Sequence, residues 1–280
     1  MTLAYILSAT SRLLSTMHDY WVKQTVGEPL YPDLLWSRPE NRNQAGKLLI
    51  VGGNAQGFAA AGEAHAEAVK AGIGTARVLL PDSLQKTVGR VLEAGEYAPS
   101  TPSGSFARRA LTELLELSAW ADGVLLAGDL GRNSETAVLL EQFVQKYSGQ
   151  LTLTKDAADY FTKAPLGVLD RADTLLVVSF AQLQKIATKS HFLRAFTFEM
   201  SLLQVVQALH EFSQQHQAAI IVKHLETMLV AVNGRVSTTK LKEDIEIWRV
   251  KTAAHAAVWW LQNPSKSFEA LSTALVNTST

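Results

Sequence analysis

The sequence has no cysteine, and this absence excludes disulfide bonds and thiolate metal sites. It also has no excess of charge of either sign, because 26 basic residues are matched by 26 acidic ones among 280. A chain without a basic field has no electrostatic means of gathering nucleic acid or anionic membrane. We therefore expect neither of these partners.

Long apolar runs are also absent, since no stretch approaches the roughly 18 consecutive apolar residues that a membrane span needs. The opening segment, MTLAYILSATSRLLSTMHDYW, is apolar in patches, but it has no basic start and its apolar runs are short. We interpret it as a helix and not as a signal peptide. The expectation is a cytoplasmic protein without a membrane segment.

Motifs that would identify a catalytic or phosphate site directly are missing as well. There is no G-x-S-x-G nucleophile elbow and no G-x-x-x-x-G-K-[ST] phosphate loop. The segment GGNAQG at 52–57 does not have the spacing G-x-G-x-x-G of a dinucleotide fingerprint. His65, His210, His216 and His255 lie in helical patterns without metal-ligand spacing, so we interpret them as structural and predict no metal site.

What the chain does contain is an alternation of short apolar strands with helices. The predicted core strands are KLLIVGG, TARVLLP, GVLLAG, QLTLT, TLLVVS and AAIIVK. Buried strands that alternate with helices indicate a parallel sheet covered on both faces. TMLVAV and RVSTT, joined by Asn233 and Gly234, then predict an antiparallel hairpin.

The segments between and after these strands are predicted as helices or loops. We expect helices at 83–95, 180–188, 192–215 and 247–261 and after Pro264, and a loop at YAPSTPSGS. Residues 27–46 carry three prolines and the polar run NRNQAG, which predicts an arm and not a regular element. The predicted organisation is therefore an N-terminal helix and arm at 1–42, followed by one α/β domain at 43–280.

Polar and glycine residues follow the predicted strands, at the edge where open parallel sheets bind ligands. The candidate ligand-binding residues there are Gly53, Asn54, Gly128, Asp129, Gly131, Arg132 and Lys223. Lys155 is a further candidate cation at the same edge. Each also has an ordinary structural explanation: Gly53 can make a tight turn, and the neighbouring Asp156 can cap a helix.

The order of these segments resembles the ribokinase-like superfamily, and within it the ADP- or ATP-dependent NAD(P)H-hydrate dehydratases. The likeness covers residues 43–262 and is carried by KLLIVGGNAQGFAAAGEAHAEAVKAGIGTARVLLP and by LLAGDLGR, which is similar to the family's GPGLGR loop. LTLTKDAA and IIVKH are similar to LVLDADAL and VVLKG. The resemblance implies a three-layer αβα sandwich, mostly parallel, with ADP or ATP and Mg²⁺ as cofactors and an NAD(P)H-like ligand.

The family's activity is the repair of hydrated NADH and NADPH by phosphorylation and elimination of phosphate, and several of its motifs are altered here. HPGE corresponds to SFAQ at 179–182, and LDAD keeps only Asp156, which is therefore the one catalytic candidate. The glycine-rich GTGD corresponds to LKEDIEIWRVKTAAHAAVWW, which has no glycine. An anion can still meet the helix amino terminus near Lys251 and Thr252, while Asp244 has no assigned role.

Three functions follow from these observations. The leading one is a diverged relative of the dehydratase with impaired catalysis, a pseudoenzyme that binds a nucleotide or dinucleotide. The second is an active dehydratase, a lyase, or a small-molecule kinase that uses replacement residues. The third is a non-catalytic assembly protein with Trp248, Trp259 and Trp260 facing a partner, although we prefer core packing for at least two of them. In each case we expect a homo-oligomer.

Overall fold

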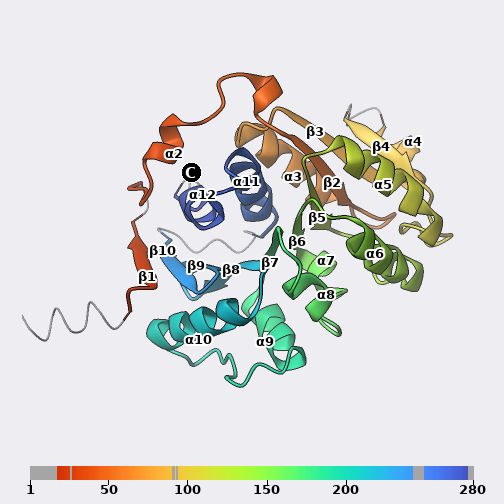
Figure 1. Ribbon diagram of the computed structural model, residues 1–280. Helices are drawn as coiled ribbons and strands as arrows, with labels where there is room; N and C mark the ends of the chain where they lie inside the picture. Colours follow the sequence, from red (N-terminus) through yellow and green to blue (C-terminus); the bar gives the residue numbers. More distant parts are fainter. Residues whose placement is uncertain (1–17, 26, 90–91, 93, 242–248, 277–280) are drawn as a thin grey trace, which may run out of the picture.

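The computed structural model describes residues 18–25, 27–89, 92, 94–241 and 249–276. One ten-stranded sheet runs through these residues, with helices on both of its faces (Figure 1). The strands are β1 (Trp21–Gln24), β2 (Lys47–Gly52), β3 (Thr75–Pro81), β4 (Gly95–Ala98), β5 (Gly123–Gly128), β6 (Gln150–Thr154), β7 (Thr174–Val178), β8 (Ala219–His224), β9 (Thr227–Val232) and β10 (Arg235–Lys240).

The sheet is mostly parallel, in the order β1-β10-β9-β8-β7-β6-β5-β2-β3-β4. Only β9 runs against its neighbours, since it pairs antiparallel with both β8 and β10. Every residue of β5, β6 and β7 is buried, because helices cover both faces of the central strands. The predicted fold class, with its antiparallel hairpin near one edge, is confirmed.

The helices form two layers around this sheet. They are α2 (Asp33–Trp36), α3 (Ala59–Lys70), α4 (Gln85–Val88), α5 (Leu111–Trp120), α6 (Ser134–Lys146), α7 (Lys155–Asp159), α8 (Leu166–Leu169), α9 (Phe180–Lys189), α10 (Leu202–Gln215), α11 (Arg249–Gln262) and α12 (Ser267–Ala274). Helices α3, α11 and α12 cover one face, and α5 to α10 cover the other (Figure 1). Among the described residues, no helix has both the length and the apolar character needed to cross a bilayer.

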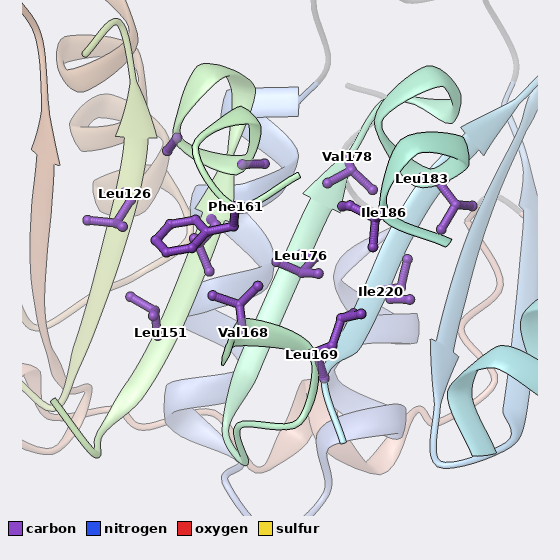
Figure 2. Packing of buried hydrophobic residues seen from close by; sticks show 14 of the residues in the cluster. Leu126, Leu151, Phe161, Val168, Leu169, Leu176, Val178, Leu183, Ile186 and Ile220 are labelled. Carbon is purple, nitrogen blue, oxygen red and sulfur yellow. The ribbon is translucent and has the colours of Figure 1, made fainter. Parts of the chain in front are cut away.

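Each face of the sheet has its own apolar core. On the face covered by α5 to α10, Leu126, Leu151 and Leu176 of three neighbouring strands pack with Val168 and with residues of α9 (Figure 2). On the opposite face, alanines of α3 and α11 allow these two helices to lie close together above β5. These two cores hold the strand ends in fixed positions.

The N-terminal arm contributes a strand that the sequence does not predict. The helix expected at the start lies largely outside the described residues, but Trp21 begins β1, which pairs parallel with β10. The Trp21 Nε1–H donates to Thr238 Oγ1 at 3.0 Å, and the buried Gln24 amide donates to Thr239 Oγ1 at 3.0 Å and to the Ser272 carbonyl at 2.7 Å. These long-range bonds determine the strand, and local pattern could not reveal them.

Two other elements differ from expectation. The helix expected at 83–95 is described as only one turn of α4 after a 3₁₀ turn, and the loop expected at YAPSTPSGS begins inside β4. Pairing with β3 makes this short segment a strand despite its proline-rich continuation. Likewise α10 begins only at Leu202, because Ser201 and Gln204 form a capping box there.

Candidate functional site

The strand-end cluster consists of Asn54, Asp129, Gly131, Lys155 and Asp156, which follow β2, β5 and β6. These strands are adjacent and parallel, so their carboxyl ends meet at one edge of the sheet. Asn54 Nδ2 donates to the Asp129 carbonyl at 2.6 Å, and the Gly131 N–H donates to Asp156 Oδ2 at 3.1 Å. The structure therefore brings these residues, predicted separately, into direct contact.

The backbone of the cluster is strained at two residues that are not glycine. Asp129 and Lys155 have φ angles of 56° and 49°, in the left-handed region that favours glycine. Such a conformation costs on the order of 1 to 3 kcal/mol per residue and is concentrated at functional sites. Gly128, with φ at 102°, cannot be replaced freely, because a Cβ there would lie 2.7 Å from Asp156 Oδ1.

The carboxylate of Asp129 is fully engaged within the protein. Its Oδ1 lies 2.6 Å from Lys155 Nζ, and its Oδ2 accepts the Ala60 N–H at 2.8 Å, at the start of α3. The ion pair is partly shielded, with 33% of the Lys155 side chain and 19% of the Asp129 side chain exposed. Asp129 thus ties three elements together.

Asp156 is held differently. Its Oδ2 accepts from Gly131, but its Oδ1 is buried without a hydrogen-bond partner among the described residues. Burial raises the pKa of this carboxyl group above its ordinary value, and the charge of Asp129 adds to the rise, although loop N–H groups oppose it. An acid in this state is easier to protonate and a weaker ligand for a cation.

A third loop, residues 99–107, closes over the cluster and was not predicted to do so. The Gly104 carbonyl accepts the Ala55 N–H at 3.0 Å, and Asn133 Nδ2 donates to Ser103 Oγ at 3.1 Å. Asn133 also caps α6. From the other side, the Tyr160 hydroxyl donates to the Gly131 carbonyl at 2.5 Å.

Arg249 and the contacts of Gln182 are the parts of the site that the sequence does not predict, since the sequence identifies Gln182 only as the replacement for the glutamate of HPGE. The Gln182 side chain completes a capping box with Ser179 and donates from Nε2 to the Lys155 carbonyl at 2.7 Å and to Asp159 Oδ1 at 2.8 Å. Arg249, the first residue of α11, donates from Nη1 to Gln182 Oε1 at 3.1 Å. An arginine 67 positions away in sequence carries no local signal of this contact.

Other predicted ligand-binding residues lie apart from the cluster. Lys223 lines a surface depression of about 500 Å³ with Leu225, Glu226, Thr227 and Lys240, and β6 and β7 separate its strand from β5. Thr252 is buried, and Lys251 is exposed near Glu67 of α3. Arg132 is exposed beside the cluster and forms no ion pair with the described residues. Asp244 lies outside the described residues.

The two tryptophans and the one histidine of α11 are buried. Trp259 and Trp260 are 0% and 4% exposed, which confirms core packing for two of the three tryptophans, while Trp248 lies outside the described residues. The Trp259 indole donates to His255 Nε2 at 2.9 Å, so His255 carries its proton on Nδ1 and donates it to Glu67 Oε1 at 2.9 Å. This bond holds the pKa of Glu67 below its ordinary value, against the effect of burial.

Comparison with known proteins identifies the fold. No family model matches the sequence, and no curated protein sequence matches it significantly. A ribokinase-like superfamily protein from Enterococcus faecalis matches with a TM-score of 0.71 at 14% identity, over 92% of this chain and 86% of that one. A hypothetical protein from Streptococcus mutans matches with a TM-score of 0.66 at 15% identity, over 88% of this chain and 86% of that one.

An enzyme of known activity has the same fold. The ADP/ATP-dependent NAD(P)H-hydrate dehydratase from Bacillus subtilis, co-crystallised with ATP and Mg²⁺ and soaked with CoA, matches with a TM-score of 0.61 at 11% identity, over 90% of this chain and 87% of that one. At these identities the likeness establishes architecture and not activity. The fold is ribokinase-like, as the sequence resemblance implies.

The cluster does not fit a magnesium ion. Mg²⁺ prefers carboxylate oxygens and water in octahedral geometry. Both oxygens of Asp129 already have partners, and the remaining oxygen of Asp156 is buried where a Gly128 side chain would be. Within the described ranges, no three histidine, aspartate or glutamate side chains converge as a metal site.

Proposed function

We propose that this chain binds a nucleotide or dinucleotide at the strand-end cluster, and that it is a diverged relative of NAD(P)H-hydrate dehydratase with impaired catalysis. The observation that carries the proposal is that the carboxylates of Asp129 and Asp156 are both engaged or buried within the protein. Asp129 is neutralised by Lys155, and Asp156 holds Gly131 with its other oxygen buried. Neither carboxylate is placed to accept a proton from a bound substrate.

Phosphoryl transfer requires a group that positions or deprotonates the acceptor and cations that neutralise the migrating charge. The one catalytic candidate from sequence, Asp156, has no oxygen open to a ligand, because Oδ2 accepts the Gly131 N–H and Oδ1 is buried against Gly128. Gln182, in the position of the family's glutamate, is a neutral amide engaged with Lys155 and Asp159. These replacements support binding without efficient turnover.

Binding is supported by the remaining charges. Arg132 is exposed beside the cluster, and Arg249 of α11 contacts Gln182, which in turn contacts the Lys155 carbonyl. Lys155 lies within the cluster, where its charge is balanced by Asp129. Guanidinium and ammonium groups near a glycine-containing loop suit the phosphates of a nucleotide. The fold is one in which a dehydratase has been crystallised with ATP and Mg²⁺.

The catalytic part is tested by incubating the purified protein with hydrated NADH and either ADP or ATP and following the return of nicotinamide absorbance. We expect no turnover above the uncatalysed rate. Turnover that disappears in the Asp156→Ala variant would establish the alternative, an active dehydratase using replacement residues.

The binding part is tested by thermal unfolding with AMP, ADP, ATP, NAD and NADPH. A ligand that prefers the native state must raise the melting temperature, so we expect a shift with at least one of them. No shift with any, together with a stable oligomer in light scattering, would favour the assembly role instead. The homo-oligomer, the cytoplasmic location and the division at residue 42 remain predictions.

A further inference from the structure

We infer that the strand-end cluster takes its anionic ligand without a divalent cation, and that Arg249 supplies the positive charge that contacts the ligand. This inference rests on the proposed function and goes beyond it by naming a metal-free phosphate-bearing ligand and its anchoring residue. It departs from the ATP and Mg²⁺ with which the B. subtilis dehydratase was crystallised.

The Asp129 carboxylate is already occupied. To bind a metal ion, it would have to release Lys155 Nζ at 2.6 Å or the Ala60 N–H at 2.8 Å. Releasing the lysine would place a second unpaired cation beside the incoming metal. The charge balance of the pair therefore works against a divalent ion at this position.

Asp156 and Asp159 are also unsuited to hold a metal ion. Asp156 turns its unpartnered Oδ1 toward Gly128, where there is no room even for a methyl group, and so none for a hydrated ion. Asp159 is exposed but accepts from Gln182 Nε2 at 2.8 Å. A single exposed carboxylate is a poor magnesium site, because Mg²⁺ at such a site keeps its water shell.

The Arg249 guanidinium has N–H groups left for a ligand. One of its N–H groups donates to the neutral Gln182 Oε1, and within the described part of the chain it has no carboxylate partner. Gln182 is 5% exposed and is fixed by Ser179 at the start of its own helix and by Lys155 and Asp159 of α7, so its Oε1 has a set position for the arginine. The remaining N–H groups can contact two phosphate oxygens in the bidentate manner that lysine cannot reproduce.

The test is calorimetric titration of ADP into the full chain, in buffer with EDTA and in buffer with excess MgCl₂. We expect the affinity in EDTA to equal or exceed that with Mg²⁺, because the metal competes with Arg249 for the phosphate charge. Binding that requires Mg²⁺ would overturn the inference and leave the proposed function standing. No binding of ADP in either buffer would overturn the inference, and the proposed function would fall with it only if AMP, ATP, NAD and NADPH also left the melting temperature unchanged.

Variants then assign the anchor. Arg249→Gln should weaken ADP binding in EDTA by about tenfold or more, the loss typical of a charged hydrogen bond, and Arg249→Lys should fall between it and the parent. Arg42→Gln, an exposed arginine before the amino end of β2, is the matched control and should change affinity by no more than about twofold. Equal ADP affinity of Arg249→Gln and the parent would overturn the role of Arg249. The comparison of EDTA with MgCl₂ uses only the parent chain, so it remains valid if a variant fails to fold.

Discussion

Two half-buried acids on opposite faces of one sheet are held in opposite ways. Between α3 and α11, Glu67 accepts from His255, which accepts from Trp259, and the pKa of Glu67 is lowered. At the strand-end cluster, Asp156 has one oxygen without a partner, and its pKa is raised. The first network satisfies its charge and the second does not.

This difference in hydrogen bonding distinguishes a contact that stabilises the fold from a candidate ligand-binding site. A chain of donors that ends on a charged acceptor strengthens the packing of two helices. An unpartnered acid beside left-handed Asp129 and Lys155 destabilises the folded state, and such local strain persists only where the surrounding structure enforces it. We therefore propose that the α3–α11 contact contributes to stability and that the strand-end cluster binds a ligand.

The largest expected effect comes from removing the end of the helix network. Trp259→Ala should lower the free energy of unfolding by about 3 to 5 kcal/mol, because the side chain is fully buried. Trp36→Ala is the matched control: this side chain is 89% exposed, and its loss should change stability by less than about 0.5 kcal/mol. Urea unfolding measures both, and equal values for the two variants would refute a core role for Trp259.

A smaller effect is expected from a methyl group at the cluster. Gly128→Ala should destabilise by about 1 to 3 kcal/mol, because φ is 102° and the new Cβ would lie 2.7 Å from both Asp156 Oδ1 and Lys155 Cβ. Gly62→Ala on α3 has nothing within 4 Å of its Cβ and should be neutral or stabilise by up to about 1 kcal/mol. Thermal unfolding of both variants decides whether the cluster is as tightly packed as described.

The smallest expected changes in stability come from replacing Glu67 or Asp156 with its neutral amide, and the two changes should have opposite signs. A carboxyl group whose pKa is lowered in the folded protein stabilises the fold at pH values above its ordinary pKa, and this stabilisation is lost as the pH falls through the folded pKa. Glu67→Gln should therefore be less stable than the parent near neutral pH. A carboxyl group whose pKa is raised in the folded protein lowers the free energy of unfolding. This loss of stability is absent below about pH 4 and complete above the folded pKa. Asp156→Asn should therefore be more stable than the parent near neutral pH.

Both differences should shrink as the pH is lowered, because protonated acids resemble the neutral variants. The measurement is the free energy of unfolding from urea titrations at several pH values between about 2.5 and 8, a range that extends below the ordinary pKa values of both acids. Differences of the same sign for the two variants would remove the distinction between the contact and the cluster.

The sequence predicts the central sheet well, because β2, β3 and β5 to β8 are short apolar runs separated by clear helix signals. It also places Gly128, Asp129, Gly131 and Asp156 at one edge, since strand ends in a parallel sheet meet there. It misses β1, whose residues become a strand only by pairing with β10, more than 200 positions away. Arg249 and Gln182 are missed for the same reason: their meeting depends on packing and not on spacing.

The most direct test of the account is a crystal structure of the full chain soaked with ADP and Mg²⁺. The account predicts phosphate density against Arg249 and beside residues 128–132, with the Asp129–Lys155 pair intact and no metal on either Asp129 or Asp156. A magnesium ion held by these carboxylates, with the phosphate aligned toward an acceptor oxygen, would contradict it.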